Sequence, residues 1–256
     1  MRSGAIAVLV LAAVLRILRA ACRWDEWSLH YAAYYLPGYE AIQAGAYLDL
    51  LTTWVGLHPP LYSIVHSITS MVWPVPGAWL IFSAACSLLA VVFLLAAHPN
   101  NLLPALLLAT DPVQLHYGAE VNNYPLSVLL ISIAWWGLRT RRSWAIALAG
   151  ILGVWTHVMA GLAIVTIAIF DQRRIKVLVP IILFAIPLLG TGWLLASDAG
   201  SQRQPPLLLE LSMRDAIERF SIGWVMLFPI LLLGLVRDTA AAVGWIVCAA
   251  FWGFTV

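Results

Sequence analysis

The sequence predicts an all-α polytopic membrane protein with about nine transmembrane helices. Its 256 residues are 62% hydrophobic and 10% charged. Four long windows lack Asp, Glu, Lys and Arg: 75–108, 143–170, 177–197 and 239–256. A hydrocarbon layer of about 30 Å requires about 20 apolar residues per helix, and in lipid only helices or closed barrels satisfy the backbone. The windows are continuous rather than alternating, which favours helices.

Basic loops set the order of the spans, because short loops rich in Lys and Arg mark the cytoplasmic side. Three clusters qualify: 139–142, 173–176 and Arg237. The first apolar run has no small-residue cleavage site before its arginines, so we expect a retained helix and not a cleaved signal peptide. All three basic clusters are expected to lie inside. The predicted spans are then about 3–22, 76–97, 102–117, 124–138, a hairpin of two half-length helices within 143–170, and about 177–197, 218–236 and 240–256.

The hairpin is expected to turn at residues 155–157. Each of its halves is too short to cross a membrane, so the turn would be recessed below the outer surface. This places His157 in a membrane-embedded cavity.

Residues 23–75 are expected to stay on the outer side as interfacial helices. The segment 61–73 is too short and too rich in Ser, Thr and His to span, and 27–50 mixes Trp, Tyr and Leu with few charges. Both compositions are typical of helices that lie in the membrane interface.

This topology brings polar residues from four separate segments to the outer side. Polar groups near a membrane are expensive and usually face a cavity, so their convergence indicates a site. The residues are Asp25, Glu26, His58, Glu120, Asn122 and His157. Asp111, inside the third predicted span, needs a partner or a water cavity for the same reason.

Arg16, Arg19 and Arg23 are spaced three and four apart, so they share one face of the first helix. One interpretation is a phosphate or diphosphate site, since the planar guanidinium suits phosphate oxygens. The other is that these arginines reach lipid headgroups or complement the C-terminal end of the helix.

The adjacent carboxylates Asp25 and Glu26 also have two interpretations. One of them could act as a general base in a partly dry cavity while the other anchors structure or a metal. Alternatively, Asp25 caps a helix whose first turn contains Glu26. His58 stands before two prolines that fix an extended entry into the helix at 61–73.

Four motifs in order resemble the GT-C superfamily of membrane glycosyltransferases: "WDEW", "HPPLY", "YGAEVNNYPL" and "THV". By pattern the chain is most similar to protein O-mannosyltransferases and the aminoarabinose transferases of lipid A. The resemblance covers about residues 10–170, with additional helices after it in one integral membrane domain, 1–256. Because the chain stops in an apolar run, we expect a short member or a truncated form.

The resemblance implies transfer of a sugar from a polyprenyl-phosphate carrier to a protein, lipid or glycan acceptor, on the outer face of a prokaryotic plasma membrane. It implies Asp25 as the base, and Glu26, His58, Glu120 and Tyr124 as cavity residues. Many relatives carry an arginine where this chain has Asn122. The phosphate contact would then come from another arginine: Arg16, Arg19, Arg203, Arg214 or Arg219.

The residues fit this chemistry without the family. Displacing a phosphate from an anomeric carbon needs a base for the attacking hydroxyl and positive charge on the leaving group. A lone carboxylate base favours a single displacement with inversion. Arginines could supply the charge, as could a divalent metal held by Asp25, Glu26, Glu120 and a histidine.

Two other classes of function stay open. The chain could be a non-catalytic scaffold or lipid-binding subunit with protein partners in a larger membrane complex, which Asn122 favours. It could also be a transporter, although clustering at the outer face rather than at mid-membrane disfavours that class. Cys22, Cys86 and Cys248 lack paired spacing, so neither a disulfide framework nor a zinc cluster is expected. Nothing in the charge pattern indicates nucleic acid binding.

Overall fold

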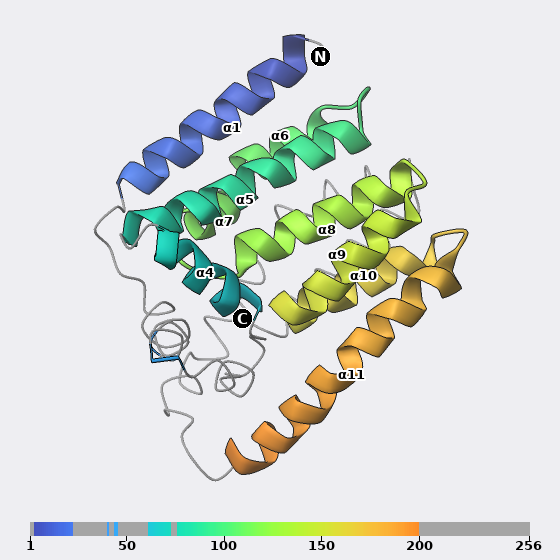
Figure 1. The fold of residues 1–256 in the computed structure, drawn as a ribbon. Coiled ribbons are helices and arrows are strands. Elements are labelled where there is room, and N and C mark those ends of the chain that lie inside the picture. The colour runs from blue at the N-terminus through green and yellow to red at the C-terminus, as the bar shows by residue number, and fades with distance from the viewer. Residues whose placement is uncertain (1–2, 23–39, 41–43, 46–60, 73–75, 200–256) are drawn as a thin grey trace, which may run out of the picture. The chain divides into compact units, whose positions relative to one another are not determined.

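The computed structural model describes residues 3–22, 40, 44–45, 61–72 and 76–199 (Figure 1). Every regular element in these residues is a helix, as the sequence predicts. The chain divides into two compact units, 1–192 and 193–256, and the described part of the second is the end of α11. The helices are α1 (Ser3–Ala21), α4 (Leu61–Val72), α5 (Pro76–Ala97), α6 (Leu103–Thr110), α7 (Pro112–Tyr117), α8 (Tyr124–Arg139), α9 (Ser143–Thr156), α10 (Val158–Ile169) and α11 (Arg174–Ala199).

Most predicted helix bounds in this part agree with the structure. Helices α1, α5 and α8 begin and end within one residue of the predicted spans, and α9 and α10 form the predicted hairpin. Helix α4 occupies the segment predicted as a non-spanning helix. The predicted spans 218–236 and 240–256 lie outside the described residues.

The predicted continuous helix at 102–117 is wrong, because the chain breaks there into α6 and α7. Asp111 has an extended backbone with φ −60° and ψ 118°, as expected for a residue that precedes proline. Its carboxylate then accepts a hydrogen bond of 3.0 Å from the Val113 N–H and caps α7. Asp111 therefore stands between two short helices, not inside one long helix.

Helix α8 is the centre of the first unit. It packs against α5 on one side and against α9 and α10 on the other (Figure 1). Several of its buried residues are small, among them Ser127, Ser132, Ala134 and Gly137. Gly137 favours this close packing, since a Cβ atom there would lie 3.0 Å from Cγ1 of Ile146 and 3.1 Å from the Arg142 carbonyl oxygen. The core beside α8 is completed by Ile164 of α10 and by Val177 and Ile181 of α11.

Large apolar side chains cover the outside of the unit. On α1 and α11 the exposed ones include Ile6, Val10, Val14, Ile17, Ile182, Leu183, Phe184 and Ile186. Exposed apolar surface of this extent marks contact with lipid or with another protein. Two helical stretches, Ser3–Ala21 and Leu80–Ala97, are long and apolar enough to cross a membrane.

Candidate functional site

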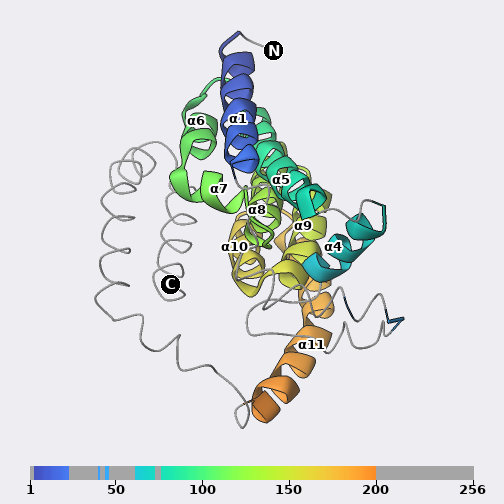
Figure 2. The ribbon, with the colours of Figure 1, turned by 90° about the vertical axis from the view of Figure 1, so that its left-hand side faces the viewer.

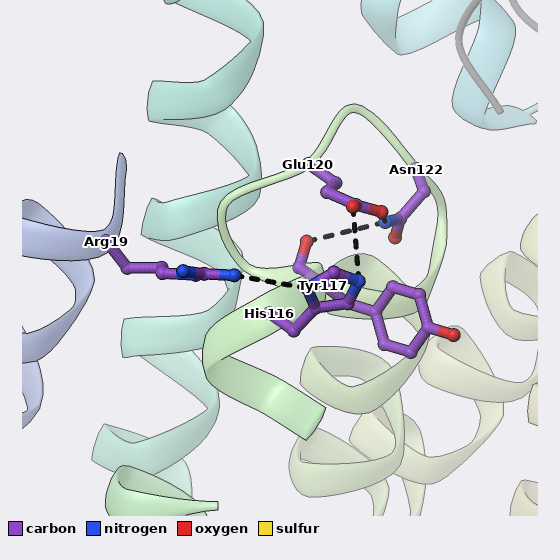
Figure 3. A network of polar contacts seen from close by, with 5 residues as sticks. All are labelled: Arg19, His116, Tyr117, Glu120 and Asn122. Atoms are coloured by element: carbon purple, nitrogen blue, oxygen red, sulfur yellow. Dashed lines mark hydrogen bonds and ion pairs between the residues drawn. The ribbon is translucent and has the colours of Figure 1, made fainter. Parts of the chain in front are cut away.

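The candidate site is the loop 118–123 between α7 and α8, together with the side chains around it. Figure 3 shows Arg19 reaching toward His116, which lies beside the loop that contains Glu120 and Asn122. Figure 2 shows α7 beside the lower part of α1, so these elements meet despite their separation in sequence. The site therefore forms where the first helix ends and the α7–α8 loop begins.

Arg19, His116 and Glu120 form a polar chain. The Arg19 Nη2 atom lies 3.4 Å from Nδ1 of His116, and Nε2 of the same ring lies 3.2 Å from Oε1 of Glu120. A guanidinium has only donors, so Nδ1 must accept. The ring proton is then on Nε2, which donates to the carboxylate. The chain thus has one direction, from guanidinium through imidazole to carboxylate.

Exposure differs along this chain. The His116 side chain is 43% exposed, whereas that of Glu120 is 11% exposed. The carboxylate is therefore held under the loop while the imidazole and Arg19 face outward. An incoming ligand would meet the two cationic or protonatable groups first.

Asn122 fixes the shape of the loop. It is fully buried, and its amide Nδ2 donates to the Tyr117 carbonyl and to Oε2 of Glu120, both at 3.4 Å. Its Oδ1 accepts a hydrogen bond of 3.0 Å from the Tyr124 N–H. Asn122 therefore joins the end of α7 to the start of α8 and holds the second oxygen of Glu120.

Helix α4 brings Tyr62, the last residue of the "HPPLY" motif, to the same loop. The Tyr62 side chain is buried, with its hydroxyl 3.2 Å from Oγ of Ser83 on α5. The backbone of Asn122 also interacts with this hydroxyl. Burial raises the pKa of Tyr62 above its usual range, because the phenolate would lose its hydration.

The α9–α10 turn closes the site from the other side. The Asn123 Nδ2 atom donates a hydrogen bond of 2.9 Å to the carbonyl of Thr156 at the end of α9. His157 is buried and accepts from the Met159 N–H through Nδ1, at 3.1 Å. The Tyr124 ring lies between Tyr117 and His157, with centroid distances of 4.7 and 5.6 Å.

The structure brings Glu120, Asn122, Tyr124 and His157 together through the contacts described above. Asp25, Glu26, His58 and Arg203 lie outside the described residues. Within the described part of the chain, no group of three or more His, Cys, Asp or Glu side chains is arranged to hold a metal ion.

Arg16 has a different position from the one predicted. Its side chain is 3% exposed, and Nε donates a hydrogen bond of 2.8 Å to Oγ of Ser87. Nη1 and Nη2 donate to the carbonyls of Ala109 and Leu108, at 3.2 and 3.3 Å. Four of its five N–H donors, counting one to Ala12, are used inside the protein. The predicted role of Arg16 as a phosphate ligand is therefore corrected to a structural one.

The need for Arg16 follows from the break between α6 and α7. In a continuous helix the Leu108 carbonyl would accept from the N–H of residue 112. That residue is Pro112, which has no N–H. The next donor, the Val113 N–H, is bound to Asp111. The carbonyls of Leu108 and Ala109 are therefore left without backbone donors, and Arg16 supplies donors to both. The charge of Asp111 is near enough to interact with the Arg16 guanidinium.

The sequence reasoning did not single out His116. A local signal was present, since His116 precedes Glu120 by four positions at the end of a helix, where such a pair is adjacent. Its contact with Arg19 spans 97 positions and has no signal in a single sequence.

Comparison of the chain with protein-family models, curated proteins and solved structures gave no match.

Proposed function

We propose that this protein is a polytopic membrane glycosyltransferase that transfers a sugar from a polyprenyl-phosphate donor on the extracytoplasmic face. The single observation that carries the proposal is the series of polar contacts from Arg19 through His116 to Glu120. It stands at the end of α1, and the Asp25-Glu26 pair begins four positions after Ala21. A cationic group, a proton carrier and carboxylates are the groups that this transfer needs.

In the proposed reaction the oxygen of the acceptor hydroxyl attacks the anomeric carbon of the donor. The bond from that carbon to the phosphate oxygen breaks, and its electron pair leaves with the phosphate. The hydroxyl proton passes to the Asp25 carboxylate. Arg19 stabilises the leaving phosphate in the place of the arginine that Asn122 replaces, and Glu120 holds His116 beside it.

The membrane arrangement belongs to the same proposal. We assign about nine spans to the full chain, with a GT-C-like module at about 10–170 and α4 in the outer interface. Helix α8 supports this arrangement, because its 16 residues put about 24 Å between the loop that contains Glu120 and the basic residues that follow Arg139. Positive charge concentrated at one end of such a helix favours that end as the cytoplasmic side.

The test is sugar transfer by the full chain in membranes, with a panel of radiolabelled polyprenyl-phosphate sugars. Asp25→Asn should abolish transfer while expression and thermal unfolding stay as in the wild type. Asp49→Asn, which neutralises another carboxylate of the same outer segment, is the matched control and should retain transfer. Retained transfer in Asp25→Asn would remove Asp25 as the base.

The scaffold alternative has its own outcome in this experiment. A folded wild-type chain that releases sugar from none of the donors, and that purifies with a fixed set of membrane proteins, would replace the transferase proposal.

A further inference from the structure

The end of the first unit opposite the candidate site has a concentration of positive charge. We call this surface the basic face. It joins the α8–α9 loop to the α10–α11 loop, which lie at the same end of the helices in Figure 1. All six of its cationic side chains are exposed: Arg139, Arg141, Arg142, Arg173, Arg174 and Lys176.

The two loops of the basic face are held together by Asp171. Its Oδ1 atom accepts hydrogen bonds from the Ser143 hydroxyl at 3.0 Å and from the Arg173 N–H at 2.7 Å. Asp171 is itself buried. The Asp171 carboxylate therefore fixes the backbone of the α10–α11 loop and ties it to the start of α9. Its position keeps the cations of the two loops on one surface.

Four of the six cations of this face have no carboxylate partner in the described part of the chain. Among the described residues, Arg141, Arg173, Arg174 and Lys176 take part in no ion pair. Arg142 lies over the Trp136 ring, 4.6 Å from its centroid, a contact that leaves the positive charge in place. Like charges on one surface repel one another, and an anion bound among them relieves that repulsion.

The backbone of Arg141 gives a second observation. Its φ is 58°, in the left-handed region that glycine favours after the C-terminal end of a helix. Any residue with a Cβ atom strains the backbone at this position, so replacing the arginine by glycine would remove the charge and the strain together.

Exposed apolar side chains lie beside the cations. Trp144 is 62% and Ile175 is 72% exposed, and Ile169 and Phe170 are also exposed. Tryptophan and arginine next to aliphatic side chains are typical of the level where hydrocarbon meets headgroups. The basic face therefore has the chemistry of a surface that sits at a membrane interface.

We propose that the basic face binds the phosphate groups of anionic phospholipids in the cytoplasmic leaflet. The apolar side chains would enter the hydrocarbon while the cations from the two loops share the headgroup phosphates. The inference rests on the membrane arrangement in the proposed function, but not on the transfer reaction. It goes beyond that reaction, since the face lies at the other end of α8.

The test measures which lipid stays with the full chain purified in detergent. The protein is equilibrated with mixed micelles that contain equal amounts of phosphatidylglycerol and phosphatidylcholine, and retained lipid is quantified by mass spectrometry. Each basic residue near an anionic surface contributes roughly fivefold in affinity. The wild type should retain phosphatidylglycerol preferentially. The triple variant Arg173→Gln, Arg174→Gln, Lys176→Gln should lose most of this preference.

Two further variants separate binding from folding. Arg173→Lys with Arg174→Lys keeps the charge and should keep the preference. Arg141→Gly relieves the backbone strain, so thermal stability should stay equal or rise while the preference for phosphatidylglycerol falls roughly fivefold.

Equal retention of the two lipids by the wild type would overturn the proposal, as would a triple variant that behaves like the wild type. Binding of an acidic polypeptide such as polyglutamate, without preference between the lipids, would overturn it in favour of a protein partner. Because no sugar donor is present, failure here is distinguishable from failure of the transfer reaction.

Discussion

Arg16 of α1 donates a 2.8 Å hydrogen bond to the hydroxyl of Ser87 on α5, and the two residues are 71 positions apart. The same guanidinium reaches the end of α6 through the carbonyls of Leu108 and Ala109. One buried side chain thus joins three helices at the point where the chain breaks before α7. Since α7 holds His116, the position of the candidate site depends on a residue that does not belong to it.

The first prediction concerns the buried guanidinium itself. Arg16→Leu should lower the free energy of unfolding by about 3 kcal/mol, because the Leu108 and Ala109 carbonyls and the Ser87 hydroxyl lose their partner in a dry environment. Unfolding in mixed micelles titrated with sodium dodecyl sulfate would measure the change. Arg19→Leu, an exposed position on the same helix, is the control and should change stability little. An equal effect of the two substitutions would contradict the structural role of Arg16.

A second prediction concerns the reason for the helix break. Pro112→Ala restores an N–H that can donate to the Leu108 carbonyl, so it should make Arg16 less necessary. In a double-mutant cycle, the loss caused by Arg16→Leu should be about 1 kcal/mol smaller in the Pro112→Ala background. Additive effects, measured by the same unfolding titration, would show that the two residues do not share this carbonyl.

The cap of α7 can be separated from the charge of Asp111. Asp111→Asn keeps an oxygen acceptor for the Val113 N–H but removes the negative charge near Arg16, whereas Asp111→Ala removes both. We expect Asp111→Ala to lower the free energy of unfolding by about 1 kcal/mol more than Asp111→Asn does, as is usual for loss of a helix cap. If the two variants unfold alike, the cap contributes nothing to stability.

The chain from Arg19 to Glu120 predicts graded losses of activity. Under the proposed function, Glu120→Gln should reduce sugar transfer about a hundredfold, because the amide cannot act as a charged acceptor for His116. His116→Gln should lose at least as much, because Glu120 acts through His116 and the amide leaves no proton carrier beside Arg19. Initial rates with a labelled donor would rank the two variants. A His116→Gln variant clearly more active than Glu120→Gln would show that Glu120 does not act through His116.

The hydroxyl that links α4 to the loop can be tested alone. Tyr62→Phe removes the contact with Ser83 and should lower the free energy of unfolding by about 1 kcal/mol. Ser83→Ala should cost a similar amount, and the double variant should cost less than the sum, because both single changes remove the same hydrogen bond. A fully additive pair would mean that the hydroxyls act independently.

Much of the helical framework was predictable because its signals are local. The uncharged windows and the basic loops fix α1, α5, α8 and the α9–α10 hairpin to within a few residues. The break at Asp111 was also within reach, since Pro112 excludes the preceding residue from helical geometry and Asp111 is a good cap. The prediction of one continuous helix gave more weight to the run of apolar residues than to the Asp111-Pro112 pair.

The sequence by itself determined most of the helices in the described part of the chain, because uncharged windows and basic loops are local signals. Only the tertiary structure decided which partners the polar side chains take. Arg16 and Arg19 lie three positions apart on one helix, yet one is buried against α5 and α6 while the other faces His116. That difference depends on the rotation of α1 against its neighbours, which is set by side-chain packing from distant segments.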